Sequence, residues 1–92
     1  MTDPLAALRE RFRVRAMADR TTLESLLQSD PEGDEFRRLV HNLAGTAGTF
    51  GYTALSLAAI EIDDQMASGL PADPASVDRL KARLDEVVQP PD

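Results

Sequence analysis

The chain has 92 residues, a formal net charge of −6 at neutral pH and no cysteine. This length fits a single domain over residues 1–92, because folded units typically need about 50–200 residues. Without cysteine the chain has no thiol catalysis, no disulfides and no zinc–thiolate site. The acidic balance argues against nucleic-acid binding, which needs a basic surface.

The sequence shows no sign of a membrane segment or a secretion signal. No apolar stretch approaches the ~20 residues that cross a bilayer, and residues 1–15 carry charges throughout. We therefore expect a cytoplasmic protein that does not bind membranes. Arginines stand at every second position from Arg9 to Arg15, so on a helix they spread around the axis. We interpret them as a solvated face.

Asp-Pro dipeptides at residues 3–4, 30–31 and 73–74 divide the chain into helical segments. An Asp side chain accepts hydrogen bonds from the free amides of a first helical turn, and Pro fits the first helical position. Each dipeptide therefore predicts a helix start or a turn just before one.

The first helix is expected from about Pro4 to Gln28. Its apolar residues recur near helical spacing, and they are Leu5, Leu8, Phe12, Ala16, Leu23, Leu26 and Leu27. The segment Thr21-x-x-Glu24 has the form of a capping box, which allows a break or kink near Arg20.

Three shorter helices are predicted over about Asp34–Thr49, Thr53–Ser68 and Pro74–Val88, with the second ending near Gly51. The third is apolar over so much of its circumference that it should lie deep in a bundle. Its apolar residues are Leu55, Leu57, Ala59, Ile60, Ile62 and Met66. The fourth should face inward with Val77, Leu80, Leu84, Val87 and Val88.

The connections between these helices are short. Short connections make consecutive helices antiparallel neighbours. The predicted fold is therefore all-α, an antiparallel up-down-up-down four-helix bundle. The tail over residues 89–92 is expected to fray.

The most informative stretch covers residues 36–52. On a helical wheel with about 100° per residue, its apolar side is formed by Phe36, Leu39, Val40, Leu43, Ala47 and Phe50. His41, the only histidine of the chain, points away from that side, and Gly45 and Gly48 share its strip. An isolated histidine is often an ordinary surface residue, so the interpretation of His41 as a functional residue depends on the two glycines.

Each glycine costs about 1 kcal/mol in a helix relative to alanine. Gly45 and Gly48 would leave the imidazole above bare backbone, where the active site of a partner can approach it. Two other interpretations stay open: the glycines permit close helix packing, or the helix ends early near Ala44. Gly51 is expected to end the helix as a left-handed residue.

The segment His41-Asn-Leu-Ala44-Gly45-Thr-Ala-Gly48-Thr-Phe-Gly51 resembles the histidine-containing phosphotransfer (Hpt) domains of two-component relays. The family pattern is a histidine, a lysine and glycine at the third and fourth positions after it, two small residues, a glycine, and a further glycine that closes the helix. A long helix before this segment and two helices after it agree as well, so the resemblance covers nearly the whole chain. The departure is Ala44, where the family usually carries a lysine near the phosphate.

The resemblance implies that the protein shuttles phosphoryl groups between aspartates of receiver domains, in response regulators or hybrid histidine kinases. His41 would carry the phosphoryl group. The residues expected to contact the phosphate or the partner are Arg37, Arg38, Asn42, Ala44, Gly45, Gly48 and Thr49. Either Arg37 or Arg38 replaces the missing lysine charge, or the partner supplies it.

No cofactor of its own is expected, because no carboxylate cluster suited to Mg²⁺ surrounds His41. The Mg²⁺ should come from the acidic pocket of the receiver. The sequence has no glycine-rich phosphate loop between a strand and a helix, so we expect neither kinase nor ATPase activity. We expect a stand-alone, monomeric shuttle.

Three other classes of protein are alternatives to this interpretation. A docking protein that binds and blocks a receiver without being phosphorylated fits the loss of the lysine, but it does not explain the histidine. A metal-binding bundle needs inward Glu-x-x-His pairs, which one outward histidine cannot supply. A helical dimerisation module should show a second exposed apolar stripe on the first helix, for which Val14 and Met17 give only a hint.

Overall fold

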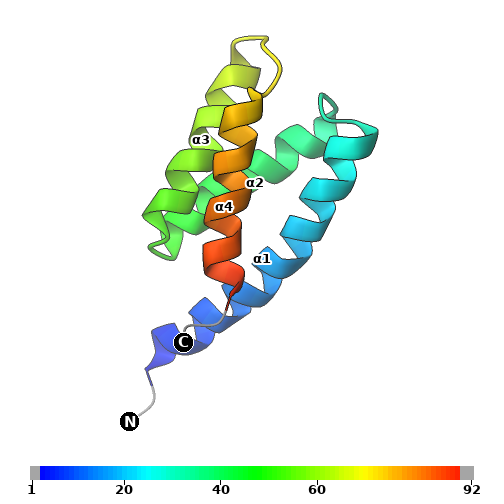
Figure 1. Ribbon diagram of the computed structural model, residues 1–92. Helices are drawn as coiled ribbons and strands as arrows, with labels where there is room; N and C mark the ends of the chain where they lie inside the picture. The colour runs from blue at the N-terminus through cyan, green and yellow to red at the C-terminus, as the bar shows by residue number, and fades with distance from the viewer. Residues whose placement is uncertain (1–2, 90–92) are drawn as a thin grey trace.

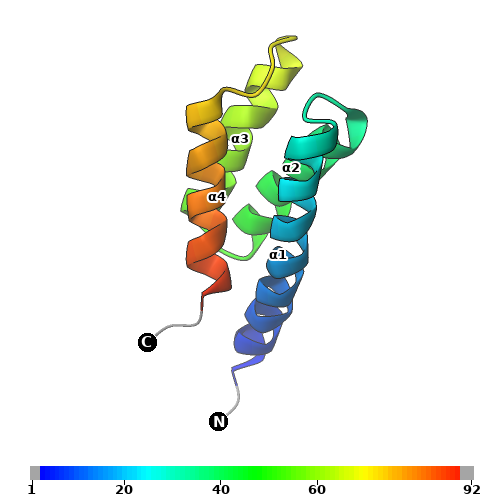
Figure 2. The same ribbon diagram turned by 45° about the vertical axis from the view of Figure 1, so that its right-hand side comes forward.

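The computed structural model describes residues 3–89 of the chain. They form four helices, α1 (Pro4–Ser29), α2 (Asp34–Thr49), α3 (Thr53–Ala67) and α4 (Pro74–Val88), with no strand in this part of the chain. Successive helices run in opposite directions, and α1 lies beside α4 (Figures 1 and 2). The predicted all-α four-helix fold is confirmed. The expected fraying concerns mainly residues 90–92, outside the described residues.

The Asp-Pro dipeptides act in two ways. The Asp3 carboxylate accepts a hydrogen bond from the Leu5 amide at 2.9 Å, and Asp73 accepts one from the Ser76 amide at 3.3 Å. Both therefore cap the helices that begin at the next residue. Asp30 instead ends α1 and begins the turn to α2, whose N-cap is Gly33.

The predicted break near Arg20 is wrong, because α1 is continuous. The Thr21 hydroxyl donates to the Met17 carbonyl, one turn back in the same helix, at 3.3 Å. It is therefore not available to cap a new helix start. The Arg20 guanidinium bonds to the carboxylate of Asp85 in α4 and holds this middle part of α1 against the bundle.

All four helices contribute to one core. It consists of Phe12, Ala16, Leu23, Phe36, Val40, Leu43, Ala47, Leu55, Ala58, Ala59, Ile62, Met66, Leu80 and Leu84. Each helix packs against two others, so α1 and α3 both contact α2 and α4 and do not contact each other. Within residues 3–89, no helix combines the length and apolar character that crossing a bilayer requires.

Two predictions of burial are wrong. Leu57 and Ile60 of α3 are 61% and 39% exposed, because α3 has helical neighbours on two sides only and its third side faces solvent. Leu5 and Leu8 of α1 are 54% and 39% exposed. The reason is length: α1 has 26 residues and α2 has 16, so the first turns of α1 extend past the end of its neighbour (Figure 2).

Candidate functional site

A tight turn after α2 sets how α2 and α3 face each other. Gly51 has a φ of +84°, the left-handed conformation predicted for it. The Tyr52 amide donates to the Ala47 carbonyl at 2.8 Å, and the Gly51 amide donates to the Gly48 carbonyl at 3.2 Å. This pair of bonds is the Schellman pattern of helix ends. Because α3 then runs back along α2, residues equally distant from Tyr52 in sequence lie opposite each other.

His41 is exposed on α2 and is held on one side only. Its side chain is 73% exposed, and its Nδ1 atom lies 3.2 Å from the Asp63 carboxylate oxygen of α3. When Nδ1 carries the proton it donates to Asp63, and Nε2 keeps its lone pair. No hydrogen bond to Nε2 occurs among residues 3–89. The ring is therefore anchored through one nitrogen and presents the other to solvent.

Asp63 is the site residue that the sequence analysis missed. The apolar pattern of its own helix assigns Asp63 no role. A signal was present, since His41 and Asp63 are equally far from Tyr52 along the chain. Gly48 and Ser56 follow the same rule, and these two residues also meet across the helix pair.

Gly45 leaves open space one turn beyond His41. A Cβ atom at this position would meet nothing within 4 Å. The helix continues through it, and the Thr49 hydroxyl donates to the Gly45 carbonyl at 3.0 Å. The early helix end near Ala44 is therefore excluded, and the bare strip predicted beside the imidazole is present at Gly45.

Gly48 has a different role, because it faces α3. A Cβ atom here would lie 3.2 Å from the Ser56 hydroxyl oxygen. That hydroxyl is held in place, since it donates to the Ala44 carbonyl at 2.7 Å. Gly48 thus permits close approach of the two helices, the alternative left open by the sequence, and Ala44 lies partly buried along the same contact.

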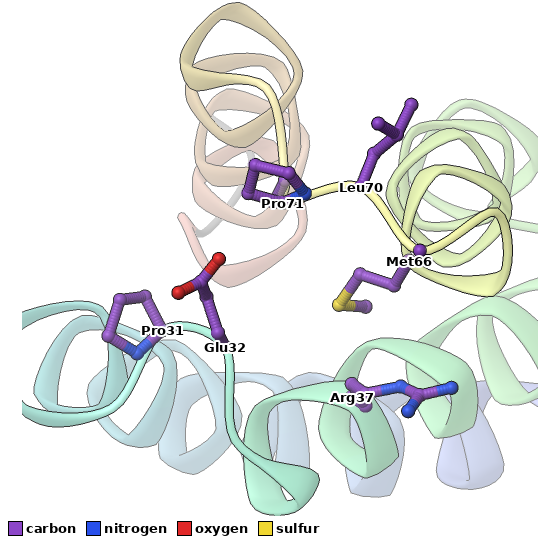
Figure 3. A pocket seen from close by; sticks show the side chains of 8 residues that line it. Pro31, Glu32, Arg37, Met66, Leu70 and Pro71 are labelled. Atoms are coloured by element: carbon purple, nitrogen blue, oxygen red, sulfur yellow. The ribbon is translucent and has the colours of Figure 1, made fainter.

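The two arginines before His41 are exposed, and the structure brings neither into a hydrogen bond with the ring. Side chains on a helix tilt toward its N-terminus, which for Arg37 and Arg38 is away from His41. Arg37 lines a hollow of about 210 Å³ with Met66 and the turns at that end of the bundle (Figure 3). It is therefore placed at the end of the bundle, beside the α3–α4 loop.

The other predicted contact residues lie on the solvent side of α2. Asn42 and Thr49 are both exposed. On the same helix the Thr46 hydroxyl donates to the Asn42 carbonyl at 2.8 Å. Within residues 3–89 no group of three or more histidine, aspartate or glutamate side chains could hold a metal ion.

The comparisons with known proteins add one finding about this site. The family model described as Hpt domain matches residues 7–90. Neither the curated proteins nor the solved structures contain a significant match. Because the family model covers nearly all of the 92 residues, this chain belongs to the Hpt domain family, whose domains serve phosphotransfer in two-component phosphorelays.

Proposed function

We propose that this domain relays phosphoryl groups between receiver-domain aspartates through a phosphohistidine at His41. One observation carries the proposal: the exposed imidazole is anchored to Asp63 through Nδ1, Nε2 has no hydrogen-bond partner among residues 3–89, and Gly45 leaves open space one turn further along the helix. A nucleophile needs one reactive atom that is accessible and one contact that fixes its orientation. His41 has both.

In the proposed reaction, the Nε2 lone pair attacks the phosphorus of an aspartyl phosphate in line with the bond that breaks. A P–N bond forms, the P–O bond to the aspartate breaks, and the carboxylate leaves with its electron pair. The Nδ1 proton stays on the ring and continues to donate to Asp63, which balances the charge that develops on the imidazole. Transfer to a second aspartate reverses these steps.

The charge on the transferring phosphoryl group needs positive partners. Ala44 supplies none, because its methyl side chain carries no charge, and it lies partly buried against the core. Arg37 and Arg38 lean toward the start of α2. These placements favour the second of the two options from the sequence, in which the receiver and its Mg²⁺ supply most of the positive charge.

Incubation with phosphorylated receiver domains tests the proposal. Expected is an acid-labile phosphate on the wild-type protein that maps to His41 and is absent from His41→Gln. Glu35→Gln is the matched control, an exposed residue of the same helix outside the expected contact residues, and it should keep its phosphate. Tight binding without any phosphate on His41, across the receivers tested, would instead identify a docking protein.

The proposal that the domain works as a separate shuttle protein is tested by the mass of the native polypeptide. A band near 10.0 kDa in an immunoblot of cell extract is expected. A larger band would place the domain within a longer protein and leave the chemistry of His41 unaffected.

A further inference from the structure

The negative charge of Asp63 is directed at the imidazole and at no arginine. Glu61, two residues earlier on α3, is bonded to the Arg79 guanidinium at 2.6 Å, so a cation neutralises it. Within residues 3–89 the only ion-pair partner of Asp63 is His41, at 3.2 Å. The His41 ring is therefore joined to a carboxylate whose charge is not shared with another side chain.

The other charged groups on α2 and α3 do not cancel this charge at the ring. Arg37 and Arg38 precede His41 by about one turn and are exposed, and side chains on a helix lean toward its N-terminus, here away from the ring. On α3, Asp64 is the neighbouring exposed carboxylate. Of these groups, Asp63 alone bonds to the imidazole.

The charges of the remaining helices are directed elsewhere. On α1, Arg11 and Arg15 lie beside α2 at Thr46, and Arg15 pairs with Asp19. In the part of the chain that the structure describes, no side chain of α1 forms a hydrogen bond or an ion pair with His41. The fourth helix does not contact α2.

A proton on Nδ1 determines how easily a phosphoryl group can leave Nε2. With this proton in place the phosphorylated ring is positively charged, and breaking the P–N bond releases neutral imidazole. Without it, the same break would release an imidazole anion, a far poorer leaving group. The bond to the leaving group is largely broken in the loose transition state of phosphoryl transfer, so the proton acts strongly on the rate.

The carboxylate of Asp63 is placed to hold this proton. An opposite charge within about 4–6 Å favours the charged form of a titratable group by about 1–3 pH units. Asp63 lies closer than that, but both side chains are partly exposed and water weakens their attraction. We therefore expect an effect at the lower end, about one pH unit.

We propose that Asp63 keeps the Nδ1 proton on phosphorylated His41, so that the phosphoryl group leaves with neutral imidazole and the domain passes phosphate on instead of storing it. The inference rests on the proposed function for the phosphohistidine itself. Asp63 is a positioning residue in this reaction, because it holds a proton and touches neither the phosphorus nor Nε2.

The phosphoryl group can leave in two ways. In transfer, a carboxylate oxygen of the receiver aspartate bonds to phosphorus, the P–N bond breaks and its electron pair stays on Nε2. In hydrolysis, a water molecule takes the place of the aspartate and the product is dihydrogen phosphate. In both reactions the ring returns to neutral imidazole, with the Nδ1 proton still donated to Asp63, so no other acid is needed.

The test measures how fast phosphate is lost without any receiver. The full chain is phosphorylated with phosphoramidate, a small phosphoryl donor, and hydrolysis is followed from mildly acidic to alkaline pH. Asp63→Asn keeps an oxygen that accepts from Nδ1 but removes the charge. Asp64→Asn is the matched control, the same change at the next residue.

The expected result is a shifted pH profile. Hydrolysis of wild type should decline with a midpoint about one pH unit higher than that of Asp63→Asn. Well below both midpoints the two rates should be equal, and well above both the wild type should be about tenfold faster. A role in ring orientation alone would change the rate by the same factor at every pH. Asp64→Asn should follow wild type.

Nitrogen NMR of the phosphorylated protein gives a second readout. His41 is the only histidine of the chain, so labelled imidazole nitrogens give signals from one ring. Between the two midpoints, Nδ1 should be protonated in most wild-type molecules and unprotonated in most Asp63→Asn molecules. Identical pH profiles for the two proteins, or an equal shift in Asp64→Asn, would overturn the inference.

The proposed relay and this role of Asp63 fail in different experiments. Transfer from receivers to His41, with hydrolysis profiles that ignore Asp63→Asn, rejects the role of Asp63 and keeps the relay. A shifted hydrolysis profile after phosphorylation by phosphoramidate, without transfer from any receiver, rejects the relay and keeps the role of Asp63.

Discussion

The two sides of α3 show what separates a purely structural contact from one that leaves a side chain available for chemistry. Toward α4, the Glu61 carboxylate accepts from the Arg79 guanidinium at 2.6 Å, and the Gln65 side chain bonds to both Ser76 and the Asp73 amide. Toward α2, the Asp63 carboxylate meets the His41 ring at 3.2 Å. Both sides use polar groups to join helices.

The two contacts differ in whether a lone pair remains on the side chain after the bond is made. A guanidinium has no lone pair for chemistry and remains charged, so Arg79 only joins α4 to α3. An imidazole bonded through one nitrogen retains a second, which on His41 faces solvent. The α3–α4 contact therefore stabilises the bundle, while the α2–α3 contact also orients the side chain that we propose as the nucleophile.

The largest expected effect comes from closing the open strip beside the nucleophile without touching either contact of α3. Gly45→Leu should slow phosphotransfer on the order of 100-fold, because the new side chain stands where the receiver must approach. Folding should persist, since a Cβ at Gly45 meets nothing within 4 Å and leucine favours helix. Single-turnover transfer and thermal unfolding by circular dichroism measure the two effects.

Gly45→Ala is the control for this change. It should stabilise the helix by up to about 1 kcal/mol and leave transfer within a few-fold of wild type. Wild-type transfer in Gly45→Leu with intact helicity would show that Gly45 does not serve access.

A smaller loss is expected when the nucleophile loses its anchor. Asp63→Ala should slow transfer about tenfold, equivalent to about 1.4 kcal/mol, because the ring then rotates freely and Nδ1 loses its acceptor. Asp63→Asn should recover part of the rate, since its carboxamide oxygen still accepts from Nδ1. Rapid-quench assays of wild type, Asp63→Asn and Asp63→Ala measure whether the transfer rate falls in that order.

Asp64→Ala is the matched control, because Asp64 is the neighbouring exposed carboxylate on α3. It should transfer like wild type. An Asp64→Ala effect as large as that of Asp63→Ala would point to the general charge of the helix and not to the bond with His41.

The packing of the α2–α3 contact is tested at Gly48. Gly48→Ala gains helix propensity, but its methyl group would lie 3.2 Å from the Ser56 hydroxyl oxygen. We expect the free energy of unfolding of Gly48→Ala to be about 1 kcal/mol lower than that of Gly45→Ala. Urea titrations of the two variants measure this difference. The difference in unfolding free energy between Gly48→Ala and Gly45→Ala should become smaller when both variants also carry Ser56→Ala, because the hydroxyl oxygen that the methyl group would crowd is then absent. Equal stability of the two alanine variants would contradict this role for Gly48.

The elements of this fold followed well from local chemistry. The bounds predicted for α2 and α4 match the structure, because their caps and turn residues, such as Asp73 and Gly51, act within a few positions in sequence. Burial was harder to predict. Leu8 and Ile60 fit the periodic pattern but are exposed, since burial depends on where a neighbouring helix ends or lies, and periodicity within one helix does not contain that information.

The site was predictable to a similar extent. His41 and the open strip at Gly45 followed from the wheel of a single helix. Asp63 and the packing role of Gly48 depend on which residues of α3 come opposite them, so they required the pairing of two helices. The exposure of Leu8 depends on the relative lengths of α1 and α2, which no pattern in α1 alone reveals.

The smallest effect concerns the α3–α4 contact and appears as pH dependence. The Arg79 guanidinium, helped by the Ser76 hydroxyl, lowers the pKa of Glu61 from its ordinary value of 4.5. A lowered carboxyl pKa stabilises the folded state above the ordinary value, and this contribution is lost as the pH falls through the folded value. Glu61→Gln should therefore be slightly less stable than wild type at neutral pH and equal to it in strong acid. The effect is small because both side chains are partly exposed.

Asp19 on α1 gives a control, because its pKa is shifted in the opposite direction from that of Glu61. Burial raises the pKa of its carboxyl above the ordinary 3.8, although Arg15 acts in the other direction. Ionised Asp19 therefore costs stability at neutral pH, and Asp19→Asn should be more stable than wild type there, with the gain vanishing below the ordinary value. Urea unfolding across the acidic range measures both differences. If Glu61→Gln changed stability equally at every pH, the Arg79 pair would not be the cause, and apolar packing with the hydrogen bonds of Gln65 would hold α3 to α4.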